Sequence, residues 1–313
     1  MYLKKPKFWN KKNILSYLLL PFTIITKINN FIKSNNPKKK SKKIKTICVG
    51  NIYVGGTGKT PTTIKLYQLC KKTMNVATAK KFYTKHKDEE ILLKNKTNFI
   101  TAKNRSKIIE QAIKKKYEVL IFDDGLQDSL IDYDIKIVCF DGNSGIGNGF
   151  LIPAGPLREN LNNLIKYDIA LIKSNGNNTN SLVKLIKKYN SKINIFTSKF
   201  IIKKINKINK SRKFLIFSGI GNPKNFEQIL LNNKIKIIKN IVFPDHYKYT
   251  NSDLNYILDK AKRINAKILT TEKDYVKIPT KFKKYIEFLT VELVINDEEK
   301  LFKLLKKKIN DKN

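Results

Sequence analysis

Residues Ile44–Pro61 read I-K-T-I-C-V-G-N-I-Y-V-G-G-T-G-K-T-P, an apolar run followed by a glycine-rich turn and a Lys-Thr pair. This order is typical of a buried strand that leads through a phosphate-binding loop into a helix. The backbone N–H groups and the helix N-terminus would face the phosphates, Lys59 would reach the outer ones, and the Thr60 hydroxyl would ligate Mg²⁺. A glycine turn that merely joins a strand to a helix is the alternative. We favour a nucleoside triphosphate site made of Tyr53, Val54, Gly55, Gly56, Thr57, Gly58, Lys59 and Thr60.

Strand and helix patterns alternate along the rest of the chain. Strands are predicted at Ile44–Val49, Val76–Ala79, Val119–Phe122, Ile137–Phe140, Ile169–Ile172, Ile195–Thr197, Phe214–Phe217, Lys267–Leu269 and Ile286–Val291. Helices are predicted at Thr60–Lys72, Arg105–Lys115, Ser181–Tyr189, Pro223–Leu231, Ser252–Ile264 and Asp297–Lys308. This alternation predicts the α/β fold class, with a P-loop NTPase-type doubly wound, mainly parallel sheet and a second, smaller α/β domain.

We divide the chain into four parts by composition. Residues 1–40 are predicted to form a membrane-associating N-terminal helix, and residues 41–200 the P-loop domain. Residues 201–212, rich in Lys, Asn and Ile, are a hinge or linker, and residues 213–313 are the smaller C-terminal α/β domain.

The composition is strongly basic, with 64 Lys and Arg against 25 Asp and Glu and a formal net charge of +39. Such a charge suits a polyanion or an anionic membrane as partner. Only Arg105, Arg158, Arg212 and Arg263 are arginines, and Asn and Ile are also heavily used, which is typical of A/T-rich codon bias. The charge is therefore weak support for nucleic-acid binding. The three Cys lie in apolar patterns without metal or redox spacing, which indicates core residues of a reducing compartment.

An uncharged, mostly apolar segment, Asn13–Thr26, lies between two groups of lysines. It is shorter than the ~20 residues that a spanning helix needs, and Pro21 interrupts it. No small-residue cleavage site follows, which argues against a secretory signal. Trp9, the only Trp, stands where an interfacial anchor would lie. We expect an interfacial helix on an anionic membrane surface; a core helix packed on the nucleotide domain is the alternative.

Two carboxylates, Asp123 and Asp124, end the apolar run V-L-I-F that begins at Val119. P-loop proteins place the acid that holds Mg²⁺, directly or through water, after such a strand. Asp123 and Asp124 are therefore predicted to share a metal site with Thr60. A Gly- and Pro-rich loop, Asp141–Glu159, follows the next predicted strand and should lie at the carboxyl edge where open α/β sheets bind ligands.

Two polar segments carry weaker signals by themselves. H-K-D-E-E at His86–Glu90 follows the second predicted strand and has the composition of a solvated loop. F-P-D-H-Y at Phe243–Tyr247 opens a loop of the second domain. A lone His beside an Asp is more often structural than catalytic.

Together these motifs resemble the tetraacyldisaccharide 4'-kinase (lipid A 4'-kinase) family. In chain order they are V-G-N-I-Y-V-G-G-T-G-K-T-P (Val49–Pro61), D-D-G-L-Q (Asp123–Gln127), G-N-G-F-L-I-P-A-G-P-L-R-E (Gly147–Glu159), F-S-G-I-G-N-P (Phe217–Pro223), F-P-D-H-Y-K-Y-T (Phe243–Thr250) and T-T-E-K-D (Thr270–Asp274). The family's phosphate loop also lacks the first glycine of G-x-x-x-x-G-K-[ST], the position of Tyr53 here. The Lys-flanked N-terminal helix resembles the family's membrane-docking helix.

The resemblance implies an activity and a setting. The family transfers the γ-phosphate of ATP, with Mg²⁺, to the 4'-hydroxyl of a lipid-linked glucosamine disaccharide 1-phosphate in lipid A biosynthesis. It implies a peripheral or monotopic protein at the cytoplasmic face of the inner membrane. We expect no nucleic-acid partner, and a monomer is favoured.

The resemblance also implies residue roles. Asp88 stands where the family's G-D-E motif supplies the catalytic acid, and His246 matches the histidine that pairs with it. With Lys59, these are the expected catalytic residues, because a carboxylate near the acceptor hydroxyl can take its proton as the O–P bond forms. Acceptor contacts are expected from Asn51, Gln127, Arg158 and Glu159.

The chain departs from the family at three places. K-D-E at Lys87–Glu89 replaces G-D-E, which leaves Asp88, Glu89 and Glu90 open as the catalytic acid. K-K-F-Y at Lys80–Tyr83 replaces the family's S-R-G-Y in a shortened segment. Asp128 stands where a His usually follows D-D-G-[LF]-Q.

Two other function classes are the alternatives. A basic P-loop ATPase acting on nucleic acid would explain the charge, but no nucleic-acid motif is present and the charge is spread along the chain. A GTPase switch would need the guanine-reading N-K-x-D, which T-E-K-D at Thr271–Asp274 echoes only superficially. The lipid kinase is the function that we expect.

Overall fold

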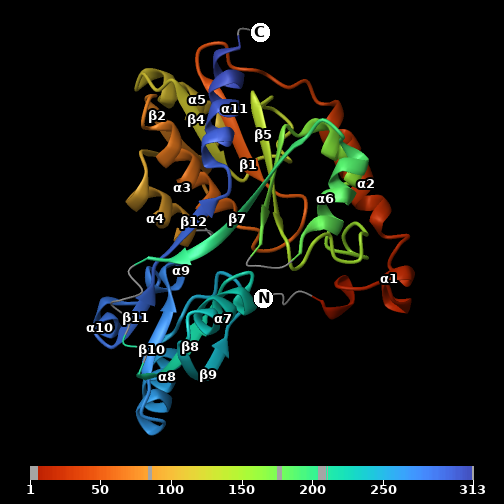
Figure 1. Ribbon diagram of the computed structural model, residues 1–313. Helices are drawn as coiled ribbons and strands as arrows, with labels where there is room; N and C mark the ends of the chain where they lie inside the picture. The colour runs from red at the N-terminus through yellow and green to blue at the C-terminus, as the bar shows by residue number, and fades with distance from the viewer. Residues whose placement is uncertain (1–5, 84–86, 175–177, 204–208, 210, 312–313) are drawn as a thin grey trace. The chain divides into compact units, whose positions relative to one another are not determined.

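The computed structural model describes residues 6–83, 87–174, 178–203, 209 and 211–311 (Figure 1). The chain forms two compact units, which we name the larger unit (residues 6–83, 96–199 and 294–311) and the smaller unit (residues 87–95 and 200–293). These units differ from the predicted parts in two places: residues 87–95 belong to the smaller unit and residues 294–311 to the larger one. The C-terminal segment joins the larger unit through ion pairs such as Lys65–Glu298 (2.7 Å) and Lys308–Asp168 (2.7 Å). Of the predicted hinge at 201–212, residues 204–208 and 210 lie outside the described residues.

The larger unit contains an eight-stranded sheet in the order β12-β7-β6-β5-β1-β4-β2-β3. Its strands are β1 (Lys45–Gly50), β2 (Val76–Lys81), β3 (Phe99–Ala102), β4 (Val119–Asp123), β5 (Ile135–Asp141), β6 (Ile169–Lys173), β7 (Asn194–Ile202) and β12 (Val291–Ile295). Its helices are η1 (Lys7–Trp9), α1 (Ile14–Leu18), α2 (Thr23–Asn35), α3 (Lys59–Cys70), α5 (Arg105–Lys114), η2 (Leu161–Lys166), α6 (Asn180–Tyr189) and α11 (Glu298–Asn310). The pairs formed among β1 to β7 are parallel, which confirms the predicted sheet.

The central strands are buried on both faces, as parallel strands covered by helices should be. Alternate residues of β1 and β4, such as Cys48 and Phe122, pack with Ile108 and Ala112 of α5. The intervening residues, such as Ile47 and Ile121, are equally buried and lie on the other face of the sheet. Strand β1 lies between β4 and β5 (Figure 1), so the loops after these three strands leave the sheet at one edge.

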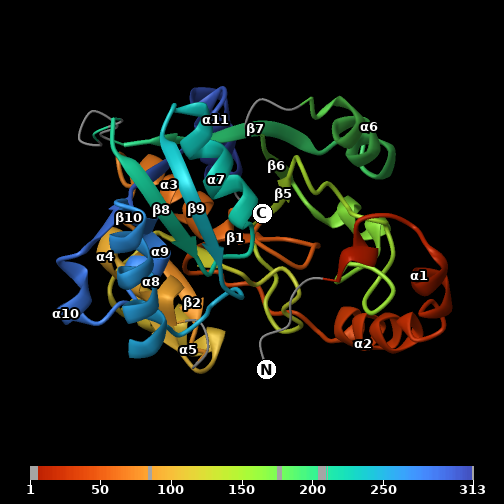
Figure 2. The ribbon, with the colours of Figure 1, turned by 90° about the horizontal axis from the view of Figure 1, so that it is seen from below.

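The apolar N-terminal segment forms two helices instead of one. Asn13 caps α1 through a capping box with Ser16, and α1 ends before Pro21. Helix α2 lies beside the loop that follows β5 (Figure 2), where the Thr26 hydroxyl donates to Ile152 O (2.7 Å) and the Asn30 amide to Arg158 O (2.8 Å). In the stretches 6–83, 87–174, 178–203 and 211–311, no helix has both the length and the apolar character needed to cross a bilayer.

The smaller unit is built on a four-stranded parallel sheet in the order β11-β10-β8-β9. The strands are β8 (Lys213–Ser218), β9 (Lys236–Val242), β10 (Lys267–Thr271) and β11 (Ile286–Leu289). The helices are α4 (Lys87–Lys96), α7 (Pro223–Asn232), α8 (Asn251–Arg263), α9 (Glu272–Tyr275) and α10 (Thr280–Lys283). This confirms the predicted second α/β domain.

Four elements depart from the sequence prediction. Strand β3 was missed because it is only four residues long, and β9 was missed because lysines and an asparagine interrupt its apolar pattern. The predicted strand Ile286–Val291 is divided into β11 and β12. The predicted loop at His86–Glu90 is, from Lys87 onward, the first turn of α4, and His86 lies outside the described residues.

Candidate active site

The phosphate loop lies between β1 and α3 in the larger unit. Gly58 precedes the helix in the left-handed region (φ 88°), and Gly55 has φ 136°, conformations that favour glycine. Helix α3 begins at Lys59, so its first N–H groups and its positive dipole end face the loop. This is the backbone arrangement of an anion site.

Two buried residues hold the loop in this shape. The Tyr53 side chain lies in the hydrophobic core with Leu157, and its backbone forms a bridge to that residue. The Asn51 side chain is 0% exposed, donates to Tyr53 O (2.6 Å) and Gly55 O (3.3 Å), and accepts from Lys59 Nζ (3.4 Å). Asn51 therefore shapes the loop, and its expected contact with the acceptor stays a prediction.

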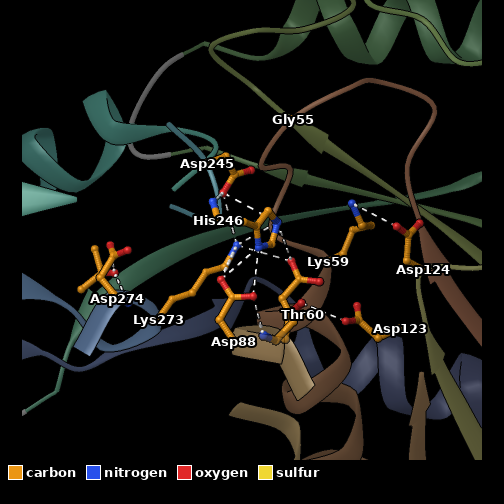
Figure 3. A network of polar contacts seen from close by, with 12 residues as sticks. Gly55, Lys59, Thr60, Asp88, Asp123, Asp124, Asp245, His246, Lys273 and Asp274 are labelled. Atoms are coloured by element: carbon orange, nitrogen blue, oxygen red, sulfur yellow. Dashed lines mark hydrogen bonds and ion pairs between the residues drawn. The ribbon is translucent and has the colours of Figure 1, made fainter. Parts of the chain in front are cut away.

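The two residues that follow the last glycine reach the carboxylates at the end of β4. Figure 3 shows Thr60 directed at Asp123, whose Oδ2 accepts from Thr60 Oγ1 at 2.9 Å. Thr63, one turn further along α3, donates to Asp123 Oδ1 at 3.4 Å. Lys59 Nζ lies 3.8 Å from Asp124 Oδ2. The residues predicted from separate motifs thus meet at the helix N-terminus.

A lysine that the sequence analysis did not assign also contacts Asp123. Lys80 Nζ, at the end of β2, lies 2.8 Å from the Asp123 Oδ2 atom that accepts from Thr60. The sequence signal was the replacement of S-R-G-Y by K-K-F-Y, but one sequence does not tell where that lysine points.

Asp124 is held in a different way. It has φ 64°, and its carbonyl oxygen accepts from Arg105 Nη2 (2.6 Å). Arg105 Nη1 pairs with Asp128 (2.6 Å), whose other oxygen caps the backbone of Leu130 (2.8 Å). Asp128, which replaces the family's usual His, therefore stabilises the turn after the two carboxylates. The Asp124 carboxylate is partly exposed, with Arg158 Nη1 at 3.7 Å.

The three other residues predicted to contact the acceptor differ in how far they are buried. Glu159 is buried and accepts from Gln127 Nε2 (2.8 Å), the Tyr167 hydroxyl (2.6 Å) and Asn163 Nδ2 (3.0 Å). Its polar atoms anchor loops, and the expected substrate contact of Glu159 stays a prediction. Gln127 and Arg158 retain exposed surface.

The oxygens around Thr60 fit a magnesium ion that arrives with phosphates. The Thr60 hydroxyl and Asp123 carboxylate are hard oxygen donors in contact with each other. In the described part of the chain, no group of three or more His, Cys, Asp or Glu side chains is placed to hold a metal by itself. Mg²⁺ commonly takes one or two protein carboxylates and fills its shell with water and phosphate oxygens, so this smaller set suffices.

The second group of polar residues lies in the smaller unit, where α4 and the loop after β9 meet (Figure 3). Asp88, in the first turn of α4, is buried, and His246 Nδ1 lies 2.9 and 3.0 Å from its two carboxylate oxygens. An ionised carboxylate only accepts, so Nδ1 carries the proton and donates. Glu89 Oε1 is further away, 3.8 Å from His246 Nε2. Among the acids left open by the sequence, this geometry favours Asp88.

His246 is held by its backbone in a sparsely populated conformation. Its φ is 59°, which is uncommon outside glycine, although His visits this region more readily than bulky residues. Its N–H donates to Gly219 O at 3.1 Å. Such strain persists only when the surroundings determine it, and it is common at functional sites.

Lys273 completes the group and was missed by the sequence analysis, although it lies in the quoted T-T-E-K-D motif. Its Nζ lies 3.4 Å from His246 Nε2, 3.7 Å from Asp88 Oδ2 and 3.5 Å from Glu89 Oε1. Burial alone would lower the pKa of Lys273, but the surrounding carboxylates, Glu89 foremost, raise it above its ordinary value. The ammonium therefore stays charged and lies against Nε2, while Nδ1 of the same ring faces Asp88.

The charge state of Asp88 follows from the same contacts. Burial alone would raise the pKa of Asp88. The hydrogen bond from His246 and the charges of Lys273 and Lys277 outweigh burial, so the pKa of Asp88 is lowered below its ordinary value. Asp88 is thus a buried, ionised carboxylate whose negative charge is stabilised by His246, Lys273 and Lys277.

Comparison with known proteins shows which family the chain matches. The sequence profile of the family described as "LpxK: Tetraacyldisaccharide-1-P 4'-kinase" matches residues 12–310. A tetraacyldisaccharide 4'-kinase of Pelagibacter ubique (strain HTCC1062) is 45% identical over 100% of both chains, and one of Rickettsia felis is 34% identical over 95% of this chain and 96% of that one. An LpxK structure from Aquifex aeolicus, an "apo" form in complex with ATP, superimposes with a TM-score of 0.69 at 24% identity, covering 95% of this chain and 100% of that chain. These findings confirm the fold and the family resemblance.

Proposed function

Because this chain belongs to the tetraacyldisaccharide-1-P 4'-kinase family, we propose that it phosphorylates the 4'-hydroxyl of a tetraacyldisaccharide 1-phosphate, with ATP as donor, in lipid A biosynthesis. The acceptor O–H loses its proton, a new O–P bond forms at the γ-phosphorus, and the bond from that phosphorus to the β–γ bridging oxygen breaks. ADP leaves with the electron pair of that bond.

The donor phosphates bind at the N-terminus of α3. The N–H groups of the loop and Lys59, at the start of α3, would face the β- and γ-phosphates, and Lys59 would offset the charge that moves to the leaving oxygen. Thr60 and Asp123 would hold Mg²⁺, with Asp124 as a further oxygen donor. When bound, Mg²⁺ supplies charge neutralisation at the phosphates. Arg158, at the end of the Gly- and Pro-rich loop, is a candidate for contact with anionic substrate groups.

Asp88 receives the proton of the acceptor hydroxyl. Its lowered pKa keeps it ionised at neutral pH, and the carboxylate offers a negative charge to a hydroxyl that becomes acidic only as the O–P bond forms. His246 orients this carboxylate through Nδ1, and Lys273 fixes the imidazole from its other side. In this arrangement His246 is a positioning residue and does not need to exchange its proton.

We expect the N-terminal helices to contact the lipid tails of the substrate and the membrane surface. Large apolar residues of α1, of α2 and of the turn between them are exposed, namely Ile14, Leu15, Leu18, Phe22, Ile24, Ile25, Ile28, Phe31 and Ile32. Single exposed apolar residues are ordinary, but a continuous set flanked by lysines is typical of an interfacial helix on anionic lipid. We infer a peripheral protein at the cytoplasmic face of the inner membrane.

The observation that carries the proposal is the contact of Thr60 with Asp123 at the N-terminus of a glycine-led helix, since it joins the phosphate loop to a metal-holding acid. The test is ATP-dependent phosphorylation of purified disaccharide 1-phosphate lipid in detergent, with Lys59→Ala as the variant. We expect transfer by the wild type and at least a hundredfold loss in the variant, because charge stabilisation of the leaving phosphate is removed. Absence of transfer by folded wild-type protein, or full activity of Lys59→Ala, would refute the proposal. The nucleic-acid ATPase is not favoured, since the family match spans nearly the whole chain.

A further inference from the structure

The replaced K-K-F-Y segment brings a lysine into the nucleotide site of the larger unit. Strands β2 and β4 are neighbours in which Ala79 pairs with Phe122, so Lys80 and Asp123 are the next residues along the two strands. Ala79 and Phe122 pack toward α5. Because side chains alternate along a strand, Lys80 and Asp123 point to the opposite face, toward α3.

Both side chains of this pair are buried. The Lys80 side chain is 3% exposed and that of Asp123 is 0% exposed, with 2.8 Å between Nζ and Oδ2. A buried ammonium or a buried carboxylate is unfavourable without a partner, so each neutralises the other. The contacted oxygen is the one that accepts from Thr60, at 2.9 Å. A protein cation therefore lies on the oxygen that a divalent metal would use directly or through water.

We propose that Lys80 is a built-in counter-cation of the magnesium site. In the nucleotide-free protein it neutralises Asp123 and holds that carboxylate against Thr60, so that a divalent cation binds there only weakly. Nucleotide phosphates add the negative charge and the oxygen ligands that let a divalent cation bind in the presence of the ammonium. Metal binding is thereby coupled to nucleotide binding. This inference rests on the proposed kinase function for the identity of the site, but its test uses neither nucleotide nor lipid.

A second buried pair in the same unit provides the matched control. Lys173 Nζ, from β6, lies 2.6 Å from Asp141 Oδ2, from β5, with side chains 6% and 3% exposed. Loss of Lys173 also leaves a buried carboxylate without its ammonium, but that carboxylate is bonded to the backbone N–H groups of residues 143 and 144, with no assigned metal role. If both lysines are merely structural, removing either should affect cation binding alike.

The experiment is a titration of nucleotide-free, full-length protein in detergent with Mn²⁺, whose free fraction is read by electron paramagnetic resonance. The proteins are the wild type, Lys80→Met and Lys173→Met, since methionine keeps most of the side-chain length without the charge. We expect the Mn²⁺ dissociation constant of Lys80→Met to be at least tenfold lower than that of the wild type, with no such gain in Lys173→Met. The melting temperature of Lys80→Met should also rise with MgCl₂ more than that of the wild type.

An unchanged or weakened Mn²⁺ affinity in Lys80→Met would overturn the proposal, as would an equal gain in Lys173→Met. If Lys80→Met folds only with MgCl₂ and not with NaCl of equal ionic strength, the proposal is supported, because the metal then replaces the missing ammonium. If neither salt restores it while Lys80→Met/Asp123→Asn folds, the proposal is refuted. A wild type that transfers no phosphate to the lipid would instead refute the proposed function, whatever the Mn²⁺ titration gives.

Discussion

Asp274 is a buried carboxylate of the smaller unit on which several segments depend, and replacing it is a strong test of how the unit is held together. Its Oδ2 accepts from Gly219 N (3.1 Å) and Thr271 Oγ1 (2.7 Å). Its Oδ1 accepts from the Tyr249 hydroxyl (2.9 Å) and lies 2.7 Å from Lys277 Nζ. Burial and the nearby carboxylate raise the pKa of Tyr249, so its hydroxyl stays a donor.

The magnitude follows from these contacts. In Asp274→Ala, two buried donors, Gly219 N and the Tyr249 hydroxyl, lose their acceptor at about 1–3 kcal/mol each. Lys277 loses its close partner but keeps Asp88 at 3.9 Å, so this cost falls well below the about 3–5 kcal/mol of a fully broken buried pair. We expect a total loss of about 4 kcal/mol, because such terms are not additive. Asp274→Asn, which keeps an oxygen for Gly219 N, should lose about half as much.

The assay is native-state hydrogen exchange by mass spectrometry, with one peptide covering β8 and one covering β4. A loss of about 4 kcal/mol predicts roughly thousandfold faster exchange in β8, since each 1.4 kcal/mol is tenfold. Strand β4, in the larger unit, should change little. Asp253→Ala is the control: Asp253 closes the capping box at the start of α8, and its loss should cost only about 1 kcal/mol.

Two outcomes would refute this reasoning. Less than tenfold faster exchange in β8 of Asp274→Ala would show that the four contacts do not organise the unit. Equal acceleration in β4 and β8 would show that the effect is not local. Because His246 N donates to Gly219 O, Asp274→Asn should also lower kinase activity, even where the protein remains folded.

The remaining predictions concern the proposed base and the N-terminal helices. Asp88→Asn should lower kcat by about 10²–10⁴-fold, with little change in ATP binding. Since the folded pKa of Asp88 is lowered, its contribution to stability is complete above its unfolded pKa of about 3.9 and is lost as the pH falls through the folded value. The difference in urea midpoint between wild type and Asp88→Asn should therefore shrink from pH 7 to pH 3; a constant difference would contradict it. Replacing the exposed Ile24, Ile28 and Phe31 of α2 by Ser should weaken flotation with anionic vesicles at least tenfold. Full burial of each of these side chains in the membrane would contribute about 1.5–3 kcal/mol to the free energy of binding. ATP binding should not change, and Leu231→Ser, a similarly exposed residue of the smaller unit, should float like the wild type.

Much of the fold and the donor site could be predicted from local pattern. The phosphate loop is contiguous in the sequence, so its strand, its glycines and the Lys59-Thr60 pair can be recognised from their order. The carboxylates at the end of β4 follow an apolar run that is typical of a buried strand. Strands β3 and β9 could not be predicted in this way, because β3 has only four residues and lysines and an asparagine interrupt the apolar pattern of β9. The loop contacts of Asn51 and Glu159 were also not predicted, because polarity in a motif does not tell whether a side chain anchors a loop.

The α/β class, the phosphate loop and the family can be read from the amino-acid sequence, because they depend on residue types at short, fixed spacings. The pairing of charged and polar groups depends on the folded chain. His246 meets Asp88 across 158 positions, Lys273 lies on the same imidazole, and Lys80 meets Asp123 across 43. The physical reason is that a buried charge must find its partner across strands and loops, so that partner is chosen by register and packing, and neither is visible in the spacing along the chain.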